Sequence, residues 1–152
     1  MPYEIQPYVG VGALRFGMTS PQIRQILGTP RFSRRDAHRL REMYGVGGPA
    51  LTFKAVAGSG ESELAEIGFA KAATDIVYRG TNLFSSERPA VVTKLYSDDP
   101  EPREVSDTLV FPTLGITLTC FHSGPEESMA VTAFARGTWD AQLVGAEPFK
   151  LA

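Results

Sequence analysis

The stretch FGMTSPQIRQILGTP, residues 16–30, decides the fold of this chain. Thr19 and Gln22 have the spacing of a capping box, in which two side chains satisfy free backbone N–H groups at the start of a helix. Gly28 adopts the left-handed backbone of a helix end readily, and a proline two residues later prevents continuation. The stretch therefore predicts a short strand that ends before the cap, and then an amphipathic helix over residues 20–28.

The pattern of this stretch occurs twice in the chain. Phe16, Pro21, Ile23 and Leu27 recur 68 residues later as Phe84, Pro89, Val91 and Leu95. Tyr44, Leu51, Phe53 and Phe69 recur 65 residues later as Leu109, Ile116, Leu118 and Phe134. A repeated unit of about 65 residues constrains the architecture strongly. We expect one domain over residues 1–152, with units at 9–72 and 76–140 and a tail at 141–152.

After each helix the apolar period changes to two, which is typical of strands. The expected strands are 31–35, 39–45, 50–56 and 64–70 in the first unit, and 108–111, 115–121 and 129–136 in the second. Short strands are also expected up to residue 17 and at residues 83–84, a second helix at 88–96, turns at 57–62 and 122–126, and a loop at 97–107. Each unit is then a strand, a helix and an antiparallel meander. We predict an α+β fold with both helices on one face of the sheet.

Composition describes an ordinary globular chain and excludes some classes of function. The chain has 152 residues, a net charge of −2 and a single cysteine, Cys120. A net acidic charge gives no reason to expect nucleic acid or an acidic membrane as a partner. One thiol forms no internal disulfide, and the N-terminal residues lack the features of a signal peptide. No apolar run has the length of a membrane span, so we expect a cytoplasmic protein.

The motif Phe16-Gly17-Met18-Thr19, then Ile23, then Leu27-Gly28 and Pro30, resembles the opening motif of the small barrel-assembly lipoproteins of bacterial outer membranes. It also resembles the repeats of beta-lactamase inhibitory protein. Both use a helical segment packed on an antiparallel meander, and the inhibitor uses it twice. The chain lacks the export signals of both groups, the lipid-bearing cysteine of the lipoproteins and the disulfides of the inhibitor. The resemblance implies a protein-binding role, and the chain looks like cytosolic bacterial immunity proteins.

Cys120 and His122 are the one pair that suggests catalysis. Residues i and i+2 of a strand share a face, so a thiol and an imidazole at this spacing can lie close together. The alternative is a buried structural thiol that extends the apolar stripe of Leu114, Ile116 and Leu118. A metal site needs three or four ligands, and no ligand spacing recurs. We therefore expect no metal, no cofactor and no enzymatic activity.

Two charged clusters and one tryptophan are candidates for a binding surface. The basic cluster comprises Arg31, Arg34, Arg35, Arg39 and Arg41. It is either a patch for nucleic acid or another anionic partner, or a solvated hairpin edge that discourages edge-to-edge pairing, and the second interpretation is favoured. The acidic cluster comprises Asp98, Asp99, Glu101, Glu104 and Asp107, in a segment stiffened by two prolines. An acidic loop steers a basic partner toward it. Trp139 is either a binding anchor or a plug of the core.

These observations predict a non-enzymatic protein that binds another protein. The most concrete form is an immunity protein that neutralises a bacterial toxin by occluding its active site, with the acidic cluster and Trp139 as contact residues. The alternatives are a structural or assembly module on the same scaffold, or an enzyme that uses Cys120 and His122.

Overall fold

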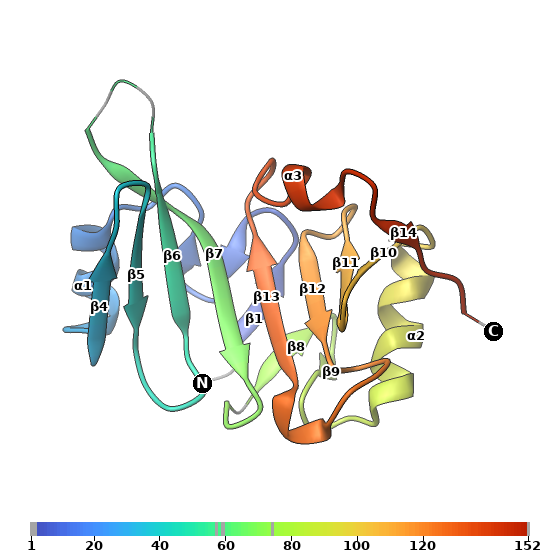
Figure 1. Ribbon diagram of the computed structural model, residues 1–152. Coiled ribbons are helices and arrows are strands. Elements are labelled where there is room, and N and C mark those ends of the chain that lie inside the picture. Colours follow the sequence, from blue (N-terminus) through green and yellow to red (C-terminus); the bar gives the residue numbers. More distant parts are fainter. Residues whose placement is uncertain (1–2, 57, 59, 74, 152) are drawn as a thin grey trace.

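The computed structural model describes residues 3–56, 58, 60–73 and 75–151, and the elements follow one another along the chain as shown in Figure 1. The helices are α1 (Ser20–Leu27), α2 (Arg88–Asp98) and α3 (Asp140–Leu143), with a 3₁₀ turn at Glu126–Ser128. The strands of the first half are β1 (Tyr3–Gln6), β2 (Gly10–Val11), β3 (Leu14–Arg15), β4 (Phe32–Arg35), β5 (Arg39–Met43), β6 (Ala50–Ala55) and β7 (Ser62–Ala70). The remaining strands are β8 (Ile76–Tyr78), β9 (Thr81–Asn82), β10 (Arg103–Val105), β11 (Thr108–Phe111), β12 (Ile116–Thr119), β13 (Ala130–Phe134) and β14 (Glu147–Pro148).

The larger sheet has nine strands in the order β14-β10-β11-β12-β13-β7-β6-β5-β4, and all of its pairs are antiparallel. Its two halves meet where β7 pairs with β13, with Ile67 opposite Ala133 and Phe69 opposite Val131. The smaller sheet has the order β3-β2-β1-β8-β9, and β1 runs parallel to β8. The smaller sheet thus links the start of each half of the chain.

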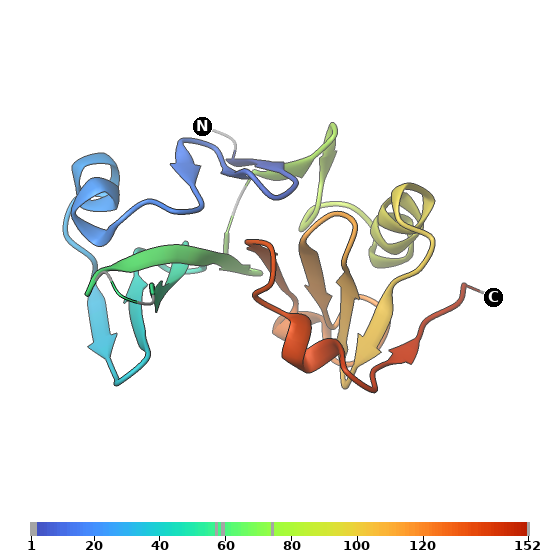
Figure 2. The ribbon, with the colours of Figure 1, turned by 90° about the horizontal axis from the view of Figure 1, so that it is seen from above.

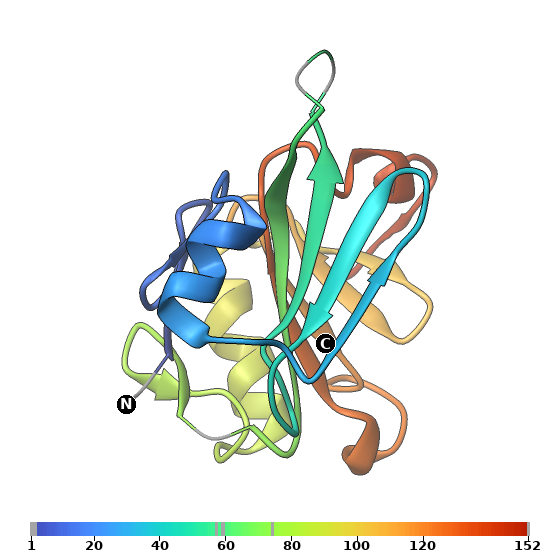
Figure 3. The same ribbon diagram turned by 90° about the vertical axis from the view of Figure 1, so that its left-hand side faces the viewer.

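Helices α1 and α2 lie on one face of the nine-stranded sheet, together with the smaller sheet (Figures 2 and 3). Helix α3 lies on the opposite face. The β4–β5 hairpin bends away from the helices, so the sheet is curved (Figure 2). The expected α+β class and the expected placement of the two main helices are both found.

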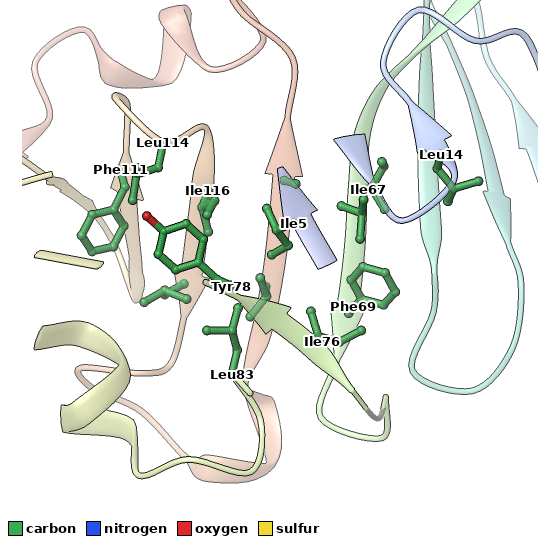
Figure 4. Close-up of a cluster of buried hydrophobic side chains, with 14 of the residues drawn as sticks. Ile5, Leu14, Ile67, Phe69, Ile76, Tyr78, Leu83, Phe111, Leu114 and Ile116 are labelled. Carbon is green, nitrogen blue, oxygen red and sulfur yellow. The ribbon is translucent and has the colours of Figure 1, made fainter. Parts of the chain in front are cut away.

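The core fills the space between the two sheets and the two helices. Ile23 of α1 and Leu95 of α2 are fully buried in one cluster that also includes the inward side chains of both sheets. Figure 4 shows Ile76 and Tyr78 of the smaller sheet next to inward side chains of the larger one. Burying apolar area of this kind is the main stabilising contribution to such a fold.

The meander strands and both main helices lie close to where the sequence predicts them. The predicted capping box at the start of α1 is present, with the Thr19 N–H donating to Gln22 Oε1 at 2.9 Å. In each half, short strands precede the main helix and further strands follow it, whereas superposition of the two units stays a prediction. The part of the predicted 57–62 turn at Ala57 and Ser59 lies outside the described residues.

The predicted loop at 97–107 is wrong in two places. Helix α2 continues to Asp98 and is capped by the Asp99 N–H, which donates to the Leu95 carbonyl at 2.9 Å. Residues Arg103–Val105 then form β10 between β11 and β14. The helix is longer than expected because tertiary contacts hold its polar end, which local propensity disfavours.

Candidate binding surface

The face of the nine-stranded sheet opposite α1 and α2 is called the open face here. Side chains alternate between the two faces of a strand, and cross-strand partners share a face. In the first half of the sheet the open-face positions are Phe32, Arg34, Arg39, Arg41, Met43, Ala50, Thr52, Lys54, Glu63, Glu66, Gly68 and Ala70. In the second half they include Thr132, Thr117 and Val110, which pair in a row across β13, β12 and β11.

The segment after β13, with α3, lies on the open-face side of the second half, near one end of β11 to β13 (Figures 1 and 2). The Trp139 indole N–H donates to Glu66 Oε1 at 3.2 Å, and its ring centroid lies 6.0 Å from that of Phe134. Val110 and Thr117 point to this face and are buried. Trp139 is half-buried, so it closes the sheet on this side while part of its ring stays accessible.

The first half of the open face has no such cover among the described residues. Phe32 keeps 58% and Met43 keeps 39% of their surface exposed, which is high for large apolar side chains. Beside them lies a depression of about 240 Å³, lined by Met43, Gly47, Gly48, Ala50, Gly68, Phe69, Ala70, Ala130 and Thr132. Its floor is built from small side chains, so a partner group can approach the backbone of the sheet closely.

The basic cluster lies on β4, on β5 and at Arg31 just before β4, at the edge of this uncovered half, and all of its arginines are exposed. Register places Arg34 directly opposite Arg41, and Arg39 directly opposite Lys54 of β6. Like charges opposite one another in a sheet are destabilising. Sequence spacing indicated a basic hairpin, but only the pairing shows that three of its arginines gather on one face with Lys54 of β6.

The acidic cluster does not form a common exposed surface, which corrects the expectation of an acidic loop. The Tyr78 hydroxyl donates to Asp98 Oδ2 at 2.7 Å, and Arg79 Nη1 lies 3.2 Å from the same oxygen. The bond from Tyr78 is the main cause that lowers the pKa of Asp98, while burial raises the pKa of Tyr78. Asp99 is buried and accepts hydrogen bonds from the backbone N–H groups of Glu101 and Thr113. Asp98 and Asp99 therefore hold the end of α2 in place.

The other three acidic residues differ in their surroundings. Glu104 lies on β10 with its Oε2 atom 2.7 Å from His122 Nε2, and Asp107 accepts a hydrogen bond from the Ser123 hydroxyl at 2.9 Å. Glu101 and Asp107 are exposed, and Glu104 is half-buried. Their role in binding a partner stays a prediction.

Cys120 and His122 lie at the end of β12 in different environments. Cys120 is buried, as predicted, and has a backbone φ of 60°. A Cβ atom added at Gly124 would lie 2.8 Å from its Sγ atom, so the thiol packs directly against that glycine. The His122 side chain is 9% exposed, and its Nδ1 atom is buried without a hydrogen-bond partner among the described residues. The contacts of the imidazole are thus with Glu104 and with Phe149, whose ring centroid lies 5.3 Å away.

A buried polar cluster between α1 and β5 was missed by sequence reasoning. Glu42 is fully buried, and its carboxylate accepts hydrogen bonds from Ser20 Oγ at 2.8 Å, Arg24 Nη2 at 2.7 Å and the Tyr44 hydroxyl at 3.1 Å. Burial is the largest single cause that raises the pKa of Tyr44 to about 12, followed by the charge of Glu42 and by the hydrogen bond to it. The burial of Glu42 could have been inferred from the alternation of the strand, because Glu42 lies between Leu40 and Tyr44 on the same face.

No protein-family model, curated protein or solved structure matches the chain. Within the described residues, no three His, Cys, Asp or Glu side chains gather in a way that could hold a metal ion. None of the helices there combines the length and apolar character needed to cross a membrane.

Proposed function

We propose that this chain is a protein-binding inhibitor without catalytic chemistry of its own, and that its partner docks on the uncovered half of the open face. The observation that carries the proposal is the pairing of exposed Phe32 and Met43 with the small-residue depression beside them. Exposed apolar side chains that cluster on a folded surface are typical of interaction sites. A rigid sheet also presents them with little loss of conformational entropy on binding.

The most specific form of this proposal is an immunity protein that neutralises a bacterial toxin by covering its active site. It is supported by the likeness of residues 16–30 to the repeats of an inhibitory protein. We no longer propose the acidic cluster as the principal contact, because Asp98 and Asp99 are hydrogen-bonded within the fold. Glu101, Asp107 and the accessible edge of Trp139 are assigned to the rim. A structural or assembly module that uses the same surface is the alternative.

Site-specific photocrosslinking in the cells that encode the chain tests the proposal. A photoreactive phenylalanine analogue is placed at Phe32 or Met43, and at Val144 as the control, because Val144 is 83% exposed and lies beyond α3. We expect one protein to be captured from the first two positions and not from the third. The captured protein is then purified and its activity titrated with the native chain and with the Met43→Asp variant.

Loss of the partner's activity with the native chain, and recovery with Met43→Asp, supports an inhibitor. Capture of a partner whose activity is unchanged indicates an assembly module. Equal capture from all three positions, or none from Phe32 and Met43, refutes the assignment of this surface.

A further inference from the structure

We infer that the partner surface bound by the uncovered half is acidic: a protein segment with clustered carboxylates around one apolar side chain. This inference rests on the proposed function and gives the partner its chemical class. It reverses the expectation that an acidic loop of this chain meets a basic cleft.

The charges on the open face of β4, β5 and β6 carry the inference. The pairs Arg34–Arg41 and Arg39–Lys54 place like charges directly opposite one another. None of the ion pairs found within the described part of the chain involves Arg34, Arg39 or Arg41. Opposed cations cost stability in the free protein, and carboxylates of a partner relieve that repulsion on binding.

The apolar positions lie in a row parallel to these charges. Phe32, Met43, Ala50 and Gly68 are consecutive partners across β4, β5, β6 and β7. The Arg34–Arg41 row lies two residues farther along the strands, which is about 7 Å at the rise of an extended strand. An apolar side chain seated in the depression therefore places carboxylates one or two residues away within reach of the guanidinium groups. Arginine is well suited to this role, because its planar fork matches a carboxylate.

A protein segment fits this surface better than a nucleic acid does. The positive region is short, since Glu63 lies opposite Lys54, and Glu66 occupies the next open-face position along β7. Phe32 is the only aromatic side chain at the open-face positions of β4 to β7, whereas binding of single strands relies on several stacking rings. The net charge of −2 also disfavours a long polyanion.

Three labelled probes of equal length test the partner class by fluorescence anisotropy at low ionic strength. The first is a Glu-rich peptide with one central leucine, the second has serine in place of that leucine, and the third is oligothymidylate. The test variant is Arg34→Glu/Arg41→Glu. The control is Lys94→Glu/Lys150→Glu, which has the same net charge but changes cations away from the uncovered half, on α2 and in the C-terminal segment. Urea unfolding of both variants confirms that they are folded.

We expect the leucine peptide to bind more tightly than the serine peptide, and both more tightly than oligothymidylate. The test variant should bind the leucine peptide about tenfold more weakly, because two exposed ion pairs are replaced by two repulsions of similar size. The control variant should change binding less than twofold.

Three outcomes overturn the inference. Tighter binding of oligothymidylate indicates a nucleic-acid surface, and equal weakening by both variants indicates an effect of net charge alone. Salt-sensitive dimerisation that Arg34→Glu/Arg41→Glu abolishes indicates a second copy of this chain as the occupant. If neither peptide binds while photocrosslinking at Phe32 and Met43 still captures an inhibited partner, the proposed function stands and only the acidic class fails.

Discussion

Replacing the buried carboxylate of Glu42 tests how the first half of the chain is held together. Glu42→Ala leaves the Tyr44 hydroxyl buried without its acceptor and removes the anion that faces Arg24. Breaking a buried ion pair costs about 3–5 kcal/mol. The Arg24 side chain is 44% exposed and regains water in the variant, so we expect the lower end, about 3 kcal/mol.

Glu42→Gln separates charge from hydrogen bonding at the same site. The amide oxygen still accepts from Ser20 and Arg24, while the amide N–H₂ donates to the Tyr44 oxygen. The charge assistance of these bonds is lost and the Tyr44 hydroxyl proton loses Glu42 as its acceptor, at about 1–2 kcal/mol in total. Urea unfolding, followed by circular dichroism and by the fluorescence of Trp139, gives both values from the shift in midpoint.

Glu63→Ala is the matched control, since Glu63 is an exposed glutamate on β7 of the same sheet. Its unfolding free energy should change by no more than about 0.5 kcal/mol. If Glu42→Ala lowers the unfolding free energy no more than Glu63→Ala does, the carboxylate of Glu42 is not buried between α1 and β5, and the buried polar cluster is wrong.

The same cluster predicts a pH dependence in the alkaline range. The pKa of Tyr44 is raised to about 12 in the folded state, so its contribution to stability is complete below pH 10 and is lost between about pH 10 and 12. Subtracting the tyrosinate absorbance titration of Tyr44→Phe from that of the native protein should show this late ionisation. In Glu42→Gln the ionisation of Tyr44 should move toward pH 10 without reaching it, because burial, the largest single cause, remains. A Tyr44 that ionises at pH 10 in the native protein contradicts this explanation.

Further predictions concern the second half of the chain. Asp99→Ala should destabilise the protein by about 1–3 kcal/mol in urea unfolding, since two backbone N–H groups lose their acceptor, whereas exposed Glu101→Ala should have little effect; equal effects refute a structural role. Gly124→Ala should lower the melting temperature more than Gly145→Ala does. Both glycines have positive φ, but only Gly124 has a side-chain atom within 3 Å of the added Cβ. Equal melting temperatures of the two variants contradict that packing. The thiol of Cys120 should react with a maleimide only on unfolding, and rapid stoichiometric labelling of the native protein speaks against its burial.

Local signals were sufficient for the elements that depend on neighbours in sequence. The capping box at Thr19 and Gln22 and the alternation in β6 are visible without tertiary structure, because a cap or a strand face involves only nearby residues. The pairing of the smaller sheet was not predicted. Short strands were expected up to residue 17 and at 83–84, and the structure places them at Leu14–Arg15 and Thr81–Asn82. Strands of two residues carry no period, and β1 pairs with β8 from the start of the second half.

The candidate surface shows the same division between local and tertiary information. The sequence by itself determined that arginines gather in the β4–β5 hairpin and that carboxylates gather near the end of α2. Only the tertiary structure decided that Arg34 and Arg41 meet on an open face, while Asp98 and Asp99 turn to Tyr78 and Thr113. The physical reason is that the sequence determines which charges are present. Strand register and burial determine which of them are paired within the fold and which stay exposed to a partner.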